Sequence, residues 1–256
     1  MWLIYMSSAN TWIANVVGLS ELLQNSLINW KPCWRLVPSR FPPVGLFDRV
    51  ADPEYLEVVF LIESLTNDRL REEAGEISLV PPDERISGPG TTPIMAAFTH
   101  LNPEGSRFTD GSYGVYYAAK DIDTAIEETK FHRKRFLEAT NQPPIEIGMR
   151  SYASDINTEF HDIRGKQSDM PDIYTSSPDQ YSYPQTLACE LRNNGSNGIV
   201  YDSVRRQGGE CIAIFRPKVL SPVRQGKHYC YVWDGSDFSN VYVKTEYKPS
   251  KRSRTR

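Results

Sequence analysis

The segment 105–138, GSRFTDGSYGVYYAAKDIDTAIEETKFHRKRFLE, contains the pattern that decides the fold of this chain. An Asp-Gly turn pair at 110–111 opens onto a run, 113–119, that is rich in aromatic and β-branched residues, as buried strands are. Asp121 and Asp123 are candidate N-caps, and the residues after them have the composition of a helix. The sequence therefore predicts a basic loop, a strand and a capped helix in direct succession.

The phase of the predicted helix separates its two adjacent glutamates. At about 100° per residue, Glu128 lies at the edge of the less polar face, whereas Glu127 points almost the opposite way, to solvent. The phase therefore selects Glu128 as the carboxylate beside a cleft. The alternative is that Glu128 is one more surface glutamate, paired with a base such as Arg133. The residues that share the less polar face are Ile122, Ala125, Thr129, His132 and Phe136.

Two separated segments of the chain resemble the RES domain, the toxin half of many bacterial toxin–antitoxin pairs. The first has Arg107, then a Tyr-Ala-Ala run at 117–119 and an Ala-Ile-Glu-Glu run at 125–128. The second, at 198–209, is GIVYDSVRRQGG and begins with a predicted strand. The family is named for an Arg, a Glu and a Ser, which the resemblance assigns to Arg107, Glu128 and Ser203. The resemblance extends over about residues 34–217.

The resemblance implies an α+β fold like that of ADP-ribosyltransferases, with mixed β-sheets flanked by helices. It also implies NAD as a substrate, with no cofactor and no metal. Arg107 then holds a phosphate, Glu128 stabilises positive charge on the ribose, and Ser203 orients the nicotinamide ribose or amide. Because the chain has neither GxGxxG after a strand nor GxxxxGK[ST], side chains must hold the phosphates. The further substrate-binding candidates are Tyr117, Arg35, Arg205 and Gln185.

Plainer roles stay open for two of these candidates. Arg35 lies in a predicted strand, and an arginine near the edge of a core more often forms a structural ion pair. Gln185 lies in the first turn of a predicted helix, where a surface glutamine is about as common as a pocket residue. We therefore rank Arg35 below Arg107 and leave both roles of Gln185 open.

The sequence departs from the family pattern in the loops around its key residues. Asp202 stands where the family usually has proline, which puts a negative charge beside Ser203. The family's Gly-Gly-Arg-Trp-Asn segment is Gly-Ser-Arg-Phe-Thr here, at 105–109. Tyr116 and Tyr117 both fit one position, and the family's spacing of eleven residues to the glutamate favours Tyr117.

The remaining pattern predicts one RES domain over 31–247, after a helical extension over 1–30 and before a basic disordered tail over 248–256. A mixed N-terminal half and a β-rich C-terminal half indicate an α+β architecture. A mobile flap is predicted within 155–179. Further helices are predicted at 10–28, 53–70 and 183–192, and further strands at 33–38, 94–98, 145–152, 198–204, 210–216, 229–233 and 240–246.

Composition and charge are those of an ordinary cytoplasmic globular protein, with 39% hydrophobic and 24% charged residues. The net charge of −3 argues against direct binding of nucleic acid. No apolar run approaches the roughly 18 residues that cross a bilayer, so no membrane segment is expected. The four cysteines are widely spaced and do not cluster with the four histidines, which argues against a disulfide framework and a zinc site.

The predicted function is a toxin that consumes NAD by cleaving the nicotinamide–ribose bond and so arrests growth. It acts as a glycohydrolase, or as a phosphorylase where phosphate intercepts the cation. Two alternatives stay open: an ADP-ribosyltransferase that modifies a host protein at the same site, and a catalytically silent binding module of the same fold. The resemblance further implies a small helix-turn-helix antitoxin as the partner, in an oligomeric complex.

Overall fold

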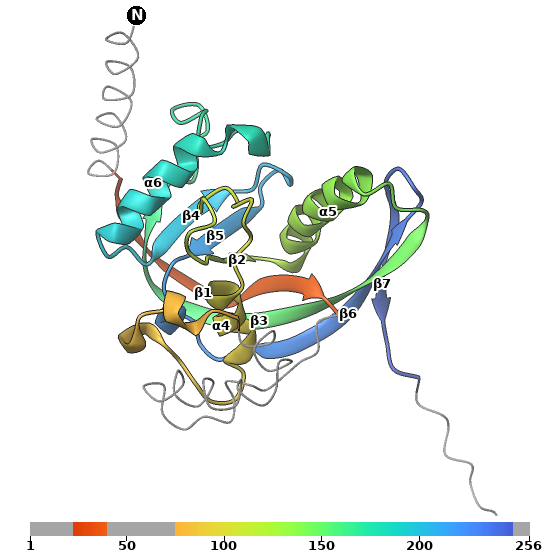
Figure 1. Ribbon diagram of the computed structural model, residues 1–256, viewed down its shortest axis with the longest axis horizontal. Helices are drawn as coiled ribbons and strands as arrows, with labels where there is room; N and C mark the ends of the chain where they lie inside the picture. The colour runs from red at the N-terminus through yellow and green to blue at the C-terminus, as the bar shows by residue number, and fades with distance from the viewer. Residues whose placement is uncertain (1–22, 40–74, 248–256) are drawn as a thin grey trace, which may run out of the picture.

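The computed structural model describes residues 23–39 and 75–247. These ranges contain seven strands and three α-helices, arranged as Figure 1 shows. The helices are α4 (Thr92–Thr99), α5 (Ile122–Ala139) and α6 (Ser182–Asn193). The strands are β1 (Asn25–Pro38), β2 (Tyr116–Ala119), β3 (Ile145–Asp162), β4 (Gly198–Asp202), β5 (Glu210–Ile214), β6 (Arg224–Trp233) and β7 (Phe238–Lys244).

The strands form one mixed sheet in the order β1-β2-β5-β4-β3-β6-β7. β1 also pairs with β3 along its length, from Asn25 opposite His161 to Pro38 opposite Met149. The circuit β1-β2-β5-β4-β3 therefore closes on itself, and β6 and β7 extend the sheet from β3. Within the described residues β3 and β4 run parallel, and the other pairs run antiparallel. The predicted α+β class is confirmed.

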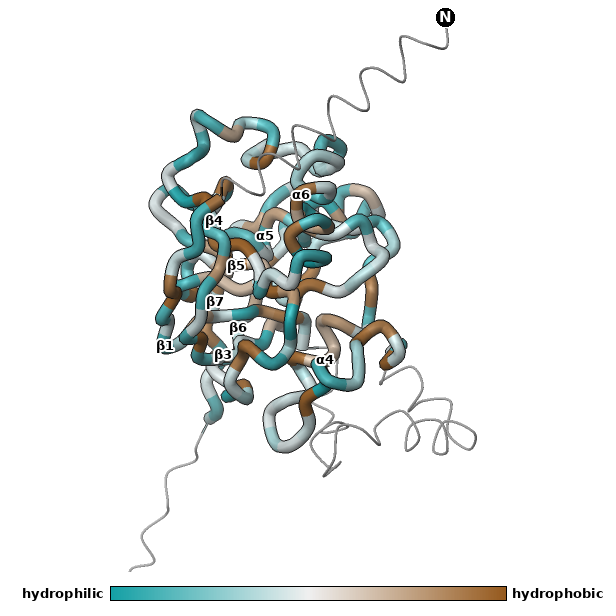
Figure 2. The backbone as a smooth tube through the Cα atoms, turned by 90° about the vertical axis from the view of Figure 1, so that its left-hand side faces the viewer, coloured by the Kyte–Doolittle hydropathy of each residue, from teal (hydrophilic) through white to brown (hydrophobic). Residues whose placement is uncertain are grey.

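The core consists of two apolar clusters, one on each face of β2. Tyr116 packs in the first cluster together with Ile94, Met95 and Phe98 of α4. Tyr117 packs against the second cluster, to which α5 and α6 contribute their buried faces. Successive side chains of a strand point to opposite faces, which explains the separation of the two tyrosines. Figure 2 shows apolar and polar residues alternating along the backbone.

The predicted succession of loop, strand and capped helix is confirmed, although β2 is shorter than the run 113–119. Asp121 is the N-cap of α5: its carboxylate accepts a hydrogen bond from the N–H of Thr124 at 2.9 Å. Such a cap satisfies one of the unpaired N–H groups of a first turn. The helix predicted at 183–192 is α6, and the strands predicted from residue 198 onward correspond to β4, β5, β6 and β7.

The strand predicted at 94–98 is wrong, because these residues belong to the helix α4. Ile94, Met95 and Phe98 are buried at helical spacing, and Pro93 lies in the first turn, where its missing N–H costs nothing. A five-residue apolar run fits a buried helix as well as a strand. Packing of α4 under β2 decides between them.

Two predicted boundaries are also wrong, because β1 and β3 are longer than predicted. Residues 25–28, predicted to be helical, pair with 158–161 of β3, so β1 begins inside the predicted extension of residues 1–30. For the same reason residues 155–162 of the predicted flap are strand. Residues 10–22, the helix predicted at 53–70 and the tail at 248–256 lie outside the described residues.

The start of β4 offers a test of the sheet. Gly198 has a φ of +144°, and a Cβ there would lie 2.0 Å from the carbonyl oxygen of Ala213 on β5. Because sheet pairing fixes that oxygen, we expect Gly198→Ala to lower the free energy of unfolding by about 3 kcal/mol or more in urea titrations. Gly208→Ala is the control, since φ there is +72° with no atom within 4 Å. Its left-handed backbone should cost about 1 kcal/mol, and equal losses in both variants would contradict the register.

Candidate active site

α5 presents Glu128 to the C-terminal half of the chain, as its phase predicts. Ser203 Oγ donates a hydrogen bond to Glu128 Oε1 at 2.6 Å. Glu127 faces the other way, where its carboxylate pairs with Lys130 at 3.0 Å and its side chain is 41% exposed. The selection of Glu128 over Glu127 as the inward carboxylate is therefore confirmed.

The less polar face of α5 is shorter than predicted. The hydroxyl of Thr129 lies 2.8 Å from that of Tyr231, which keeps the middle of the helix against the sheet. Beyond it, His132 and Phe136 are exposed, and Leu137 is the buried residue of the last turns. The buried face thus turns away from the predicted stripe over the second half of the helix.

Ser203 begins a tight loop between β4 and β5. Its N–H donates to the carbonyl of Gly209 at 2.8 Å. Its Oγ accepts hydrogen bonds from the N–H groups of Arg205 at 3.1 Å and Arg206 at 3.0 Å. With these acceptor positions occupied, the hydroxyl hydrogen is directed at Glu128. The loop therefore holds the serine and the glutamate in one mutual orientation.

Arg107 is buried, with 7% of its surface exposed. Its Nη1 donates to the carbonyl of Ile173 at 2.6 Å, and its Nη2 donates to the hydroxyl of Tyr181 at 3.3 Å. The guanidinium also lies 4.7 Å from the centre of the Tyr181 ring. No carboxylate of the described ranges forms an ion pair with Arg107. A buried cation whose partners are all neutral favours the binding of an anionic ligand.

The charges of Glu128 and Arg107 act on the same two groups, Tyr201 and Cys211, which face each other in the β4–β5 pair. Cys211 Sγ lies 3.7 Å from Glu128 Oε1. Burial raises the pKa of the Cys211 thiol well above its usual value, Glu128 raises it further, and Arg107 opposes this. Burial likewise raises the pKa of Tyr201. Neither residue is among the candidates predicted from the sequence, although the predicted hairpin of two strands could have aligned them.

Tyr117 and Gln185 hold the loop that carries Arg107. The Tyr117 hydroxyl accepts a hydrogen bond from the N–H of Phe108 at 2.9 Å and lies 2.7 Å from Ser106 Oγ. Gln185 Nε2 donates to the carbonyl of Ser106 at 3.0 Å. Burial raises the pKa of Tyr117 to about 12, although the contact with Ser106 partly offsets it. Both predicted binding residues therefore lie next to Arg107 and fix its backbone on either side.

Arg205 joins the site from the Ser203 loop. Its guanidinium lies 3.3 Å from the centre of the Phe131 ring on α5, and its Nη2 donates to the carbonyl of Ser176 at 2.6 Å. Arg107 and Arg205 thus both donate to carbonyls of the segment 163–181, which connects β3 to α6. The carboxylate of Asp202 accepts a hydrogen bond from the N–H of Gly165 in the same segment.

Arg35 lies apart from these residues. Its guanidinium stacks on the ring of Tyr116 at 4.7 Å, and its Nη1 donates to the backbone carbonyl of Tyr117 at 3.0 Å. Tyr116 belongs to the first core cluster, on the face of β2 opposite Tyr117. Burial lowers the pKa of Arg35. The structure therefore does not bring Arg35 to Glu128 and Ser203.

A hollow of about 350 Å³ lies elsewhere, between the ends of β3 and α6, and is lined by residues that include Glu159, His161 and Asn194. The candidate residues do not line it. Within the described ranges no group of three acidic, histidine or cysteine side chains is placed to hold a metal. No described helix is long and apolar enough to span a bilayer.

Comparison with known proteins identifies the family. Residues 83–234 match the model of the RES domain. The chain is also 33% identical over 219 residues to the uncharacterized protein y4oC of Sinorhizobium fredii (strain NBRC 101917 / NGR234), over 82% of this chain and 86% of that protein. The matched domain contains Arg107, Glu128 and Ser203. The protein therefore belongs to the RES domain family.

Among solved structures, the crystal structure of the M. tuberculosis MbcT–MbcA toxin–antitoxin complex contains a similar chain. The similarity has a TM-score of 0.39 at 10% sequence identity and covers 88% of this chain and 93% of that chain.

Adjacent tyrosines of β2 test how the site is held. Tyr117→Phe leaves the N–H of Phe108 without its partner, so we expect a loss of about 1–3 kcal/mol in the free energy of unfolding. Tyr116→Phe is the control, because no described residue hydrogen-bonds its buried hydroxyl, and its stability should change by less than about 0.5 kcal/mol. Urea titration measures both variants. A larger loss in Tyr116→Phe would show that the tyrosine roles are assigned the wrong way round.

Proposed function

We propose that this RES-family protein is a toxin that cleaves the bond between nicotinamide and ribose in NAD. The observation that carries the proposal is the hydrogen bond from Ser203 to Glu128, together with the buried cation of Arg107, whose charge acts on the same two groups as that of Glu128. A fixed carboxylate and a buried arginine suit a substrate that has both a developing positive charge and a phosphate. NAD has both, and the likeness to ADP-ribosyltransferases that the family implies supports the same substrate.

The proposed reaction leaves positive charge on the ribose. The electrons of the broken bond move to the nicotinamide nitrogen, which leaves as neutral nicotinamide, and C1′ of the ribose becomes oxocarbenium-like. Glu128 stabilises this carbon electrostatically, and Ser203 keeps the carboxylate oriented. Water that attacks C1′ loses a proton and gives ADP-ribose, whereas phosphate gives ADP-ribose phosphorylated at that carbon.

Arg107 and Arg205 are proposed to bind the pyrophosphate. Each now donates to a neutral carbonyl of the segment 163–181. Hydrogen bonds between charged partners are roughly twice as strong as neutral ones, and the guanidinium fork matches phosphate geometry. NAD is therefore expected to displace these carbonyls, so that the segment shifts when substrate binds. Tyr117 and Gln185 contribute by fixing the loop around Arg107.

A small helix-turn-helix antitoxin is part of the proposal. Membership of the RES family supports such a partner, since many RES domains are the toxin half of a toxin–antitoxin pair. The antitoxin is proposed to block the site in an oligomeric cytoplasmic complex until it is degraded. Consumption of NAD then arrests growth.

Nicotinamide release by the purified protein, freed of any partner, tests the chemistry. Glu128→Gln keeps the shape of the side chain without its charge, so we expect kcat to fall by roughly 100-fold or more. Glu127→Gln is the matched control, because it removes the neighbouring charge on the solvent side. It should stay within about twofold of the wild type.

The products then identify the nucleophile. Chromatography after incubation with NAD alone, with added phosphate, and with cell lysate separates three outcomes. ADP-ribose indicates a glycohydrolase, a phosphorylated ADP-ribose indicates a phosphorylase, and labelled protein indicates an ADP-ribosyltransferase. No release of nicotinamide under all three conditions would contradict the proposal and favour a silent binding module.

Expression in bacteria without an antitoxin tests the toxin role. Induction of the wild type should lower cellular NAD before growth stops, because loss of NAD is the proposed cause of arrest. Glu128→Gln, produced at the same level, should change neither the cellular NAD content nor the growth rate. The NAD content of cell extracts is measured along the growth curve, and arrest at constant NAD would refute the proposed cause.

A further inference from the structure

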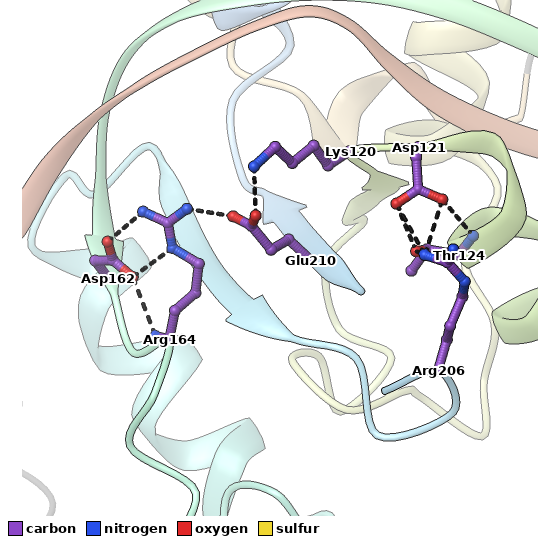
Figure 3. A network of polar contacts seen from close by, with 7 residues as sticks. All are labelled: Lys120, Asp121, Thr124, Asp162, Arg164, Arg206 and Glu210. Carbon is purple, nitrogen blue, oxygen red and sulfur yellow. Dashed lines mark hydrogen bonds and ion pairs between the residues drawn. The ribbon is translucent and has the colours of Figure 1, made fainter. Parts of the chain in front are cut away.

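One side of α5 faces the loop 203–209. Asp121, Thr124 and Glu128 are three and four residues apart, so they form a stripe along the helix. Glu128 contacts Ser203 at the start of the loop. The two other members of the stripe contact the side chain of Arg206, as Figure 3 shows. The loop is therefore attached to α5 at two places, and one of them is the candidate active site.

The attachment through Arg206 reaches the first turn of α5. Nη1 of Arg206 lies 3.2 Å from both carboxylate oxygens of Asp121 and donates to Thr124 Oγ1 at 2.9 Å. Its Nη2 lies 3.7 Å from the carboxylate of Asp123. Asp121 is the N-cap of α5, so it is itself bonded to the helix backbone. Arg206 thus connects the loop to a fixed point of the helix that carries Glu128.

The backbone of Arg206 leads to Ser203. Its N–H donates to Ser203 Oγ at 3.0 Å, and its carbonyl accepts from the N–H of Gly209 at 3.0 Å. The loop also fits closely on the stripe, because a Cβ on Gly209 would lie 2.6 Å from Thr124 Oγ1. A displacement of Arg206 therefore moves its backbone N–H, which is one of the groups that orient the Ser203 hydroxyl.

We infer that Arg206 is a positioning residue for the proposed NAD cleavage. By clamping the loop to α5, Arg206 sets the contact between Ser203 and Glu128. This inference rests on the proposed function. The side chains of Arg206 and Asp121 are 36% and 43% exposed, and ion pairs this exposed contribute little to the free energy of folding. The role of the clamp is therefore to position the loop, not to stabilise the fold. A displacement of about 1 Å at a reacting group, in contrast, can lower a rate roughly 100-fold.

Arg164 provides a matched control. It also bridges two acidic residues, Asp162 and Glu210, near the ends of β3 and β5 (Figure 3). Its hydrogen bonds within the described part of the chain go to Asp162 and Glu210, and not to Ser203 or Glu128. Arg164→Ala therefore removes a comparable ionic network without touching the clamp.

Amide hydrogen exchange tests the clamp without using NAD. We expect Arg206→Ala to speed exchange in residues 203–209 by about tenfold or more, because the loop loses its attachment to the stripe. Arg164→Ala should leave exchange in this loop within about twofold of the wild type. Unchanged exchange in Arg206→Ala would overturn the inference, whether or not the protein cleaves NAD.

Kinetics then test whether the clamp acts through Ser203. Arg206→Ala should lower kcat for nicotinamide release by roughly tenfold or more while KM for NAD changes less than about threefold. Arg206→Lys, which still reaches a carboxylate, should recover part of the loss. In a Ser203→Ala background, adding Arg206→Ala should change kcat by less than about twofold, because the group it positions is gone.

The outcomes separate the two claims. Additive losses in the double variant, or equal losses in Arg206→Ala and Arg164→Ala, would overturn the positioning role. A wild type that releases no nicotinamide would contradict the proposed function, and the exchange measurement alone would then decide whether Arg206 clamps the loop.

Discussion

Strand β5 pairs with β2 on one edge and with β4 on the other, and the candidate site depends on this double pairing. β2 leads into α5 and so carries Glu128, while β4 leads into the loop of Ser203. Two residues that are 75 positions apart thereby come within 2.6 Å. The side chains of β5 from Cys211 to Ile214 are buried. A slip of one residue on either edge would exchange the two faces of a neighbouring strand, so burial fixes the register that aligns the site.

The buried cation of Arg107 is unfavourable for the fold taken by itself. Carbonyl and hydroxyl oxygens and an aromatic ring surround it, but no described carboxylate neutralises it. Burial of a charge without a counter-ion costs free energy, and the cost falls when an anion arrives. The hydrogen bonds that Tyr117 and Gln185 make to the adjacent backbone keep the arginine in place against this cost. A costly buried charge that neighbouring hydrogen bonds hold in place is typical of a site organised to bind a ligand.

The segment 163–181 is bonded to Asp202 as well as to Arg107 and Arg205. Asp202 replaces the usual proline, and it offers the segment both an N–H and a carboxylate. The N–H donates to the hydroxyl of Tyr174 at 3.3 Å, and the carboxylate accepts from Gly165 and Gln167. Proline has neither an N–H nor a carboxylate, so it could make none of these three contacts. The departure at Asp202 thus couples the Ser203 loop to the segment whose carbonyls meet Arg107 and Arg205.

The sequence by itself determined the capped helix, its phase and hence the inward position of Glu128, because helix geometry depends on near neighbours along the chain. It also determined β4 and β5, whose patterns are local. It did not determine α4, since a short apolar run fits two structures, nor the lengths of β1 and β3, which depend on each other. Only the tertiary structure decided that Arg35 faces the first core cluster and that Arg206 contacts Asp121 and Thr124 of α5. Both contacts follow from strand pairing between distant segments. A periodic sequence pattern predicts which face of a strand or helix a residue lies on, but not which distant segment packs against that face.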